Sequence, residues 1–134
     1  MEPSPHDLAQ HSYSRCLRTP DFFRDFYAHL LASDESIEPM FSGTVTPRQH
    51  KLLQHGIGLL LSFGNNPDEV LLERLAVRHS VNGINVRPAL YTNFVDSLLV
   101  TIAQHDPKFD ETVADAWRAA LSPGLEFMKS RYEG

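Results

Sequence analysis

His79 is the residue whose surroundings best suit it to bind a metal ion. It follows Leu72, Leu75 and Ala76 by seven, four and three residues, so on a helix its imidazole lies on the apolar face. A buried imidazole needs a partner for each ring nitrogen. The carbonyl of Leu75 or of Ala76, one turn back, can accept a hydrogen bond from one nitrogen, which leaves the other with a free lone pair in apolar surroundings. This is how a protein presents a neutral imidazole to a metal.

No second protein ligand accompanies His79 at a suitable spacing. His50 and His55 are five residues apart and lie on different sides of a helix, whereas His29 and His105 lie near the ends of predicted elements. The chain has one cysteine, which excludes a thiolate cluster. A metal held by His79 alone must bring its own equatorial ligands, as heme does. The alternative is an ordinary core histidine with both nitrogens hydrogen-bonded, because a lone histidine is weak evidence.

The elements that would position His79 are helices, and proline pairs mark their starts. Four Ser, Thr or Asn residues stand directly before a proline and a stretch of helical periodicity: Ser4-Pro5, Thr19-Pro20, Thr46-Pro47 and Asn66-Pro67. The first side chain of each pair can cap free helix amides, and proline at the next position needs no N–H partner. Pro123 lies inside the last apolar repeat, which continues through it, so we expect a kink there and not an end.

Apolar residues recur at spacings of three and four along most of the chain, which predicts six main helices and no strand. The repeats run through Leu8–Leu17, Phe22–Leu31, Leu52–Leu60, Leu71–Ala76, Leu90–Ile102 and Val113–Met128. An Asn82-Gly83 pair signals a turn after the segment that carries His79. No repeat, low-complexity tract or linker interrupts the chain, so we expect one all-α domain over residues 1–134.

Composition excludes several classes of protein. The formal net charge of −5, with 17 acidic and 12 basic residues and no run of Lys or Arg, lacks the positive patch that nucleic acids and anionic membranes require. The longest apolar run, Ile57–Leu61, is broken by Gly58, so we expect neither a membrane span nor a signal peptide. With Cys16 as its only cysteine, the chain is expected to be cytoplasmic.

At this point the sequence resembles the single-domain globins of bacteria, over about Leu8 to Tyr132. The segment from Phe26 to Leu31 followed by Met40-Phe41 is similar to that family's second helix and the corner after it, and Leu75–His79 resembles its proximal helix. Tyr91, Ala116-Trp117 and Tyr132 agree with its last two helices. The resemblance implies a globin fold of about six to eight helices that holds heme b, iron protoporphyrin IX, through His79.

The resemblance also implies roles for side chains around the heme. Tyr27 would face the bound gas and Phe41 would stack on the heme, with further heme contacts from Leu52, Leu75, Val86, Tyr91 and Phe94. The helical register puts Leu52 at the pocket-facing aliphatic position, which makes Arg48 the distal polar residue. A register shifted by one residue would instead make Gln49 the distal polar residue and Leu53 the pocket-facing aliphatic residue, but it would turn the polar side chain of Gln54 into the core.

Two departures concern the proximal side. In the flavohemoglobin branch a Tyr and a Glu support the proximal histidine. Tyr91 can supply the first, although the stretch from His79 to Tyr91 is about two residues longer than in that branch, and Tyr132 stands where the Glu is expected. Strong electron donation from an anionic proximal partner is therefore not implied for this chain.

The function implied by the resemblance is reversible binding of a diatomic gas, O2, NO or CO, by a monomer or homodimer. Nitric oxide dioxygenation would need a separate reductase, because the chain has no Gly-rich dinucleotide fingerprint. One alternative is a gas sensor module that acts on a partner or output domain. Another is a globin-fold protein that has lost heme, against which His79 and Phe41 together argue.

Overall fold

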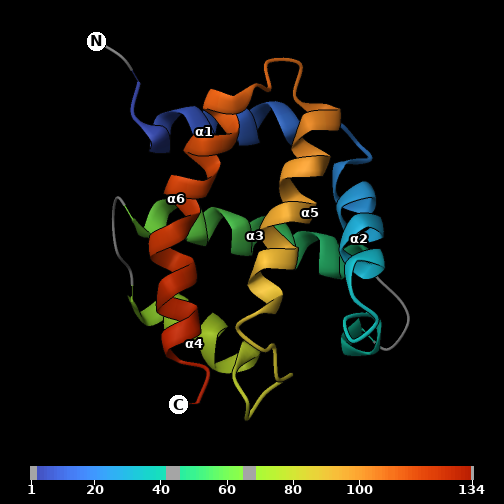
Figure 1. Cartoon of the computed structure of the whole chain (residues 1–134), viewed down its shortest axis with the longest axis vertical. Coiled ribbons are helices and arrows are strands. Elements are labelled where there is room, and N and C mark those ends of the chain that lie inside the picture. Colours follow the sequence, from blue (N-terminus) through green and yellow to red (C-terminus); the bar gives the residue numbers. More distant parts are fainter. Residues whose placement is uncertain (1–2, 42–45, 65–68, 134) are drawn as a thin grey trace.

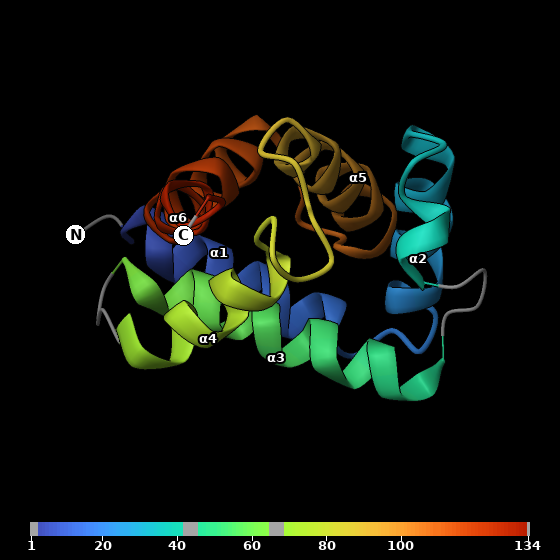
Figure 2. The ribbon, with the colours of Figure 1, turned by 90° about the horizontal axis from the view of Figure 1, so that it is seen from below.

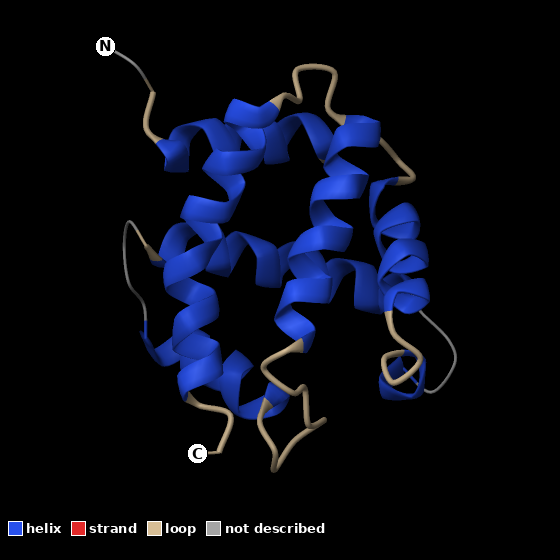
Figure 3. Cartoon of the chain, viewed as in Figure 1, coloured by secondary structure: helices blue, strands red, loops and turns tan. Residues whose placement is uncertain are grey.

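The computed structural model of the chain describes residues 3–41, 46–64 and 69–133. Over these ranges the protein is all-helical, with no strand, as the sequence predicts (Figures 1 and 3). The elements within these described ranges are six α-helices and one short 3₁₀-helix: α1 (Pro5–Cys16), α2 (Phe22–Ser33), η1 (Glu38–Phe41), α3 (Pro47–Phe63), α4 (Glu69–His79), α5 (Leu90–His105) and α6 (Glu111–Ser130).

Two of the four proline pairs cap helices as predicted. The hydroxyl of Ser4 accepts a hydrogen bond from the amide of Asp7 at 3.1 Å, and α1 begins at Pro5. At α3 a full capping box forms, because Thr46 Oγ1 accepts from the Gln49 amide while Gln49 Oε1 accepts from the Thr46 amide. This reciprocal pair fixes the start of α3, the helix that carries the predicted distal residues.

The other two pairs differ. The Thr19 hydroxyl donates to the carbonyl of Cys16 at 2.9 Å and caps no helix. Helix α2 begins two residues after Pro20, at Phe22, and the side chain of its N-cap residue, Asp21, makes no capping hydrogen bond. Asn66-Pro67 lies outside the described residues. The threonine is used at the end of α1, so the pair at 19–20 forms a turn between two helices.

Helix α6 continues through Pro123, from Glu111 to Ser130, in agreement with the expectation that proline does not end it. The residue after it, Gly124, allows α6 to cross α3 closely. A Cβ added at Gly124 would lie 2.8 Å from Leu60 Cδ2 and 3.4 Å from Leu60 Cα. A glycine at this crossing therefore sets how near the two backbones come.

The helices pack in two layers, which are visible from below (Figure 2). Helices α1, α3 and α4 form one side, and α5 and α6 lie across from them, with α2 along the edge beside α5. The main contacts join α1 with α6, α2 with α5, and α6 with both α3 and α4. This arrangement brings α2, α3, α4 and α5, which carry all the predicted site residues except Phe41 and Val86, around one region of the molecule.

A buried polar network joins the first helix to the last. Trp117 Nε1 donates to Ser12 Oγ at 2.9 Å, and Ser12 Oγ donates to Asp106 Oδ2 at 2.6 Å. Arg15 forms a two-bond ion pair with the same carboxylate, and the Lys108 amide donates to it as well. Burial alone would raise the pKa of Asp106, but these donors outweigh burial and hold it below its ordinary value.

No helix among the described residues is long and apolar enough to cross a membrane.

Candidate functional site

The imidazole of His79, the last residue of α4, makes one hydrogen bond. Its Nδ1 lies 2.8 Å from the carbonyl oxygen of Leu75, the first of the two acceptors that helix geometry offers. A carbonyl oxygen can only accept, so Nδ1 carries the proton and Nε2 keeps its lone pair. Within the described ranges Nε2 makes no hydrogen bond. Burial lowers the pKa of His79, and the nearby charge of Arg78 lowers it further. The hydrogen bond to Leu75 raises this pKa by less than burial lowers it, so the net shift is downward and favours the neutral imidazole.

A tight loop follows His79 and folds back on the end of α4. The amide of Val86 donates to the His79 carbonyl at 2.9 Å, and the amide of Ile84 donates to the Arg78 carbonyl at 2.9 Å. The predicted turn at Asn82-Gly83 forms here. A Cβ at Gly83 would lie 2.2 Å from the Arg78 oxygen, so only glycine fits at this position.

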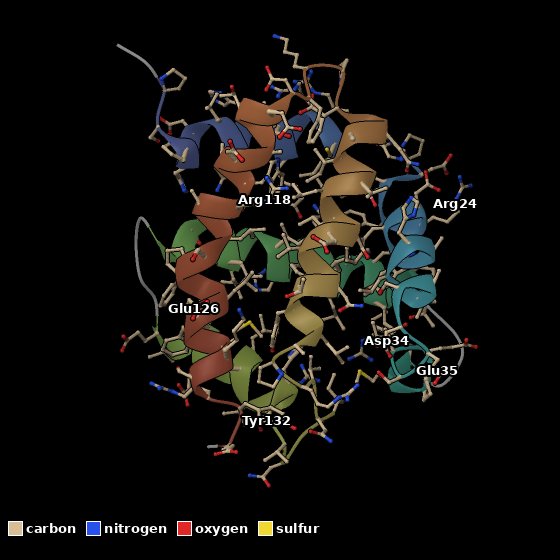
Figure 4. All side chains as sticks on the ribbon, viewed as in Figure 1. Arg24, Asp34, Glu35, Arg118, Glu126 and Tyr132 are labelled. Atoms are coloured by element: carbon tan, nitrogen blue, oxygen red, sulfur yellow. The ribbon has the colours of Figure 1, made fainter. Side chains whose placement is uncertain are left out.

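The C-terminal segment holds this loop from the other side. Tyr132, which follows α6, lies near the end of α4 (Figure 4). Its phenol donates to Asn85 Oδ1 at 2.5 Å, and its carbonyl accepts from the Val81 amide at 2.8 Å. Asn85 has a left-handed backbone, with φ of 57°. Tyr132, which the sequence analysis puts where the flavohemoglobin branch has a Glu, thus forms a clasp with the loop that follows the histidine.

Tyr27 lies on the buried face of α2, among aromatic rings from other elements. The ring of Phe41 meets it edge-on at 5.4 Å, and the ring of His50 stacks on it at 5.5 Å with an interplanar angle of 17°. Its phenol donates to the carbonyl of Gln49 at 3.2 Å. Burial raises the pKa of Tyr27 to about 12, so the phenol keeps its proton at neutral pH.

The start of α3 brings the two predicted distal candidates to different surroundings. Arg48 is exposed, and the side-chain oxygen of Gln49 is used by the capping box. Leu52 is 50% exposed, while Gln54, which the alternative register would bury, is exposed as well. The choice between Arg48 and Gln49 stays a prediction.

The other predicted contact residues are half-buried apolar side chains on the edge of the core. They are Phe41, Leu75, Val86 and Phe94. Phe94 of α5 meets Phe26 of α2 edge-on at 5.6 Å, and Leu75 of α4 lies opposite Gly56 of α3, where an added Cβ would be 3.9 Å from Leu75 Cδ2. These contacts link the four helices around the site.

Tyr91 of α5 is buried and makes no hydrogen bond to His79 within the described ranges, because His79 Nδ1 is already bound to Leu75. Burial raises the pKa of Tyr91 to about 12. Among all the residues that the structure describes, no cluster of three or more His, Cys, Asp or Glu side chains could hold a metal ion.

Sequence reasoning missed His50 as a site residue, because it was weighed only as half of a histidine pair with His55. The signal that points to it is the helix start. Because α3 begins at Thr46-Pro47, His50 lies in the first turn of α3 beside Gln49. The ring of His50 contacts the rings of both Tyr27 and Phe23, and the centroids of the His50 and Phe23 rings are 6.3 Å apart.

A comparison with family models decides the assignment, because the globin model matches residues 24–124. The chain belongs to the globin family. Among solved structures it is similar to a protein from Pseudomonas aeruginosa PAO1 that is described as structurally highly homologous to a human hemoglobin, with 35% sequence identity and a TM-score of 0.93. The match covers 98% of this globin and 100% of that chain. No curated protein matches the sequence significantly.

Globin membership implies heme binding in general, and the residues of this globin fit such a group. The fit rests on the chemistry of the donor set: a neutral imidazole whose Nε2 lone pair is not used by any described residue, held in one tautomer by Leu75. The half-buried hydrocarbon of Leu75, Val86 and Phe94 on neighbouring elements suits the apolar faces of a porphyrin.

Proposed function

We propose that this globin binds a diatomic gas reversibly on heme b held by His79, with oxygen as the principal ligand. The observation that carries the proposal is the 2.8 Å bond between His79 Nδ1 and Leu75 O, since it orients the ring and leaves Nε2 as the only metal-binding atom. When bound, heme supplies a ferrous iron with one position for a gas molecule.

The side chains that would hold the porphyrin are the half-buried apolar residues of the site. Phe41 would lie against one face of the porphyrin. Leu75, Val86 and Phe94 would contact the rest of the porphyrin. Leu52 and the distal candidate, Arg48 or Gln49, would lie on the same side of the heme as Tyr27, whose phenol donates to the Gln49 carbonyl. Because Leu52 is half-exposed at the start of α3, its burial by a bulky group would be favourable.

Tyr27 would act as the hydrogen-bond donor to the gas. Its phenol is buried and protonated, and its present acceptor is a main-chain carbonyl at 3.2 Å, which is long for a hydroxyl donor. A gas that carries partial negative charge is a stronger acceptor than this carbonyl, and apolar surroundings exclude competing water. Oxygen would therefore be retained better than carbon monoxide, which accepts hydrogen bonds weakly.

The experiment that tests heme ligation compares absorption spectra of the purified protein with those of His79→Gly and His55→Ala. The wild type and His55→Ala, a variant of an exposed histidine on α3, should give a sharp Soret band that shifts on reduction and on addition of carbon monoxide. His79→Gly should lose the heme or its spectrum, and free imidazole should restore them. A wild-type protein that retains no heme would refute the proposal, and so would an unchanged His79→Gly spectrum.

A further inference from the structure

Three aromatic rings enclose Tyr27, and His50 differs from the other two in its geometry. Phe26 and Phe41 meet the tyrosine ring edge-on, at interplanar angles of 67° and 79°. His50 alone lies nearly parallel to it, at 17°, with a centroid distance of 5.5 Å. Edge contacts leave a ring free to tilt, whereas a parallel ring covers one face and fixes the plane.

His50 is itself held in place by the fold. Its ring lies against Phe23, one turn before Tyr27 on α2, so it spans the turn of α2 that carries the tyrosine. Its main-chain amide donates to the Thr46 carbonyl in the capped first turn of α3. Within the described ranges its ring makes no hydrogen bond, so His50 acts on Tyr27 through contact alone.

The phenol of Tyr27 needs such a restraint. Its bond to the Gln49 carbonyl is long, at 3.2 Å, so this bond alone does not fix the direction of the O–H group. A tyrosine ring has two rotatable bonds, and hydrogen bonds weaken steeply when the donor is misaligned. A donor whose ring swings over a wide range would spend only part of its time aimed at a ligand.

We propose that His50 is a positioning residue that holds the ring plane of Tyr27, so that the phenol keeps one orientation toward the gas. This inference rests on the proposed role of Tyr27 as the donor. The property that matters is the flat ring of His50, because its nitrogens have no partner among the described residues. A phenylalanine at position 50 should therefore replace it, and an alanine should not.

The test uses the heme-loaded protein and its variants His50→Ala, His50→Phe, His55→Ala and Tyr27→Phe. In the reduced carbon monoxide complex, the infrared C–O stretch reports the orientation of a nearby donor. The wild type, His50→Phe and the exposed-histidine control His55→Ala should each show one narrow band. His50→Ala should show a broad or split band, and should release oxygen about threefold to tenfold faster, the change that corresponds to loss of one aromatic pair.

The outcomes separate this inference from the proposed function. If Tyr27→Phe shifts the band and speeds release while His50→Ala matches the wild type, positioning by His50 is wrong and the donor role of Tyr27 stands. A His50→Phe protein that behaves like His50→Ala also overturns the inference. If Tyr27→Phe changes neither the band nor the release rate, the donor role itself is refuted.

A merely structural role is tested in parallel. Thermal unfolding midpoints of His50→Ala and His55→Ala should be similar, whereas their infrared bands should differ. Should His50→Ala fail to fold, nuclear Overhauser contacts between the His50 and Tyr27 rings in the wild-type carbon monoxide complex decide the question. The stacked geometry predicts these contacts, and their absence would overturn the inference.

Discussion

Tyr132 and Asn85 form a direct hydrogen bond, 2.5 Å from phenol oxygen to Oδ1, that ties the C-terminal segment to the loop after His79. Because main-chain amides of this loop also donate to the carbonyls of His79 and Arg78, the tyrosine restrains the position of the proposed heme ligand. The clasp therefore connects the stability of the C-terminus with retention of heme.

Replacing Tyr132 with Phe removes this bond and keeps the ring. We expect a loss of about 0.5–1.5 kcal/mol in the free energy of unfolding and faster transfer of heme to a heme-free acceptor protein. Urea unfolding and the transfer rate would be measured together. An unchanged transfer rate would show that the clasp does not act on the ligand loop.

Replacing Tyr27 with Phe removes the proposed donor at nearly constant volume. Oxygen release should become about 10- to 100-fold faster, the range expected for a hydrogen bond to a charged acceptor, whereas carbon monoxide release should change little. The raised pKa of Tyr27, about 12, keeps the phenol protonated, so the wild-type rate should not vary between about pH 6 and 9 on its account. Flash photolysis and stopped-flow mixing measure both rates.

Replacing Asp106 with Asn should destabilise the protein by about 1–3 kcal/mol at neutral pH, because the half-buried Arg15 and the buried Ser12 hydroxyl lose their charged acceptor. The pKa of Asp106 is lowered in the folded state, so its contribution is fully present above the ordinary value of about 4 and is lost as the pH falls through the lowered pKa. The difference in the free energy of unfolding between variant and wild type should therefore be constant from about pH 5 to 7 and should shrink below about pH 4. Denaturant titrations across this pH range measure this difference. A difference that does not shrink at low pH would contradict the lowered pKa of Asp106.

Two glycines should respond oppositely to alanine. At Gly83 the new Cβ would meet the Arg78 carbonyl at 2.2 Å, whereas at Gly58, inside α3, it would meet nothing within 4 Å. Gly83→Ala should cost about 1–3 kcal/mol and displace the loop after His79, while Gly58→Ala should add about 0.5–1 kcal/mol of stability. Thermal unfolding of the Gly83→Ala and Gly58→Ala variants measures both effects. Equal changes in stability would contradict the prediction.

The fold could be predicted from the sequence because its signals are local. Capping by Ser4 and Thr46 and apolar repeats at three and four residues depend on neighbours along the chain, and the six helices follow from them. The pair at Thr19-Pro20 misled for a local reason too, since its hydroxyl bonds backward to Cys16. The hydrogen bond from His79 to Leu75 was predictable in the same way, because both residues lie on one helix.

The rest of the site depends on contacts between elements that no spacing reveals. The stacking of His50 on Tyr27 joins α3 to α2, and the bond from Tyr132 to Asn85 spans 47 residues. Neither pair has a sequence pattern, because each depends on how segments far apart in the chain pack against each other. The same limit applies to Arg48 and Gln49, whose roles turn on the rotation of α3 about its axis.

The buried network of Ser12, Asp106 and Trp117 sets an order for folding during synthesis. Its hydrogen bonds connect residues 94 and 105 positions apart, so the network cannot be complete until Trp117 of α6 has left the ribosome. A chain made at about 5–20 residues per second would therefore leave α1 without this complete network for several seconds.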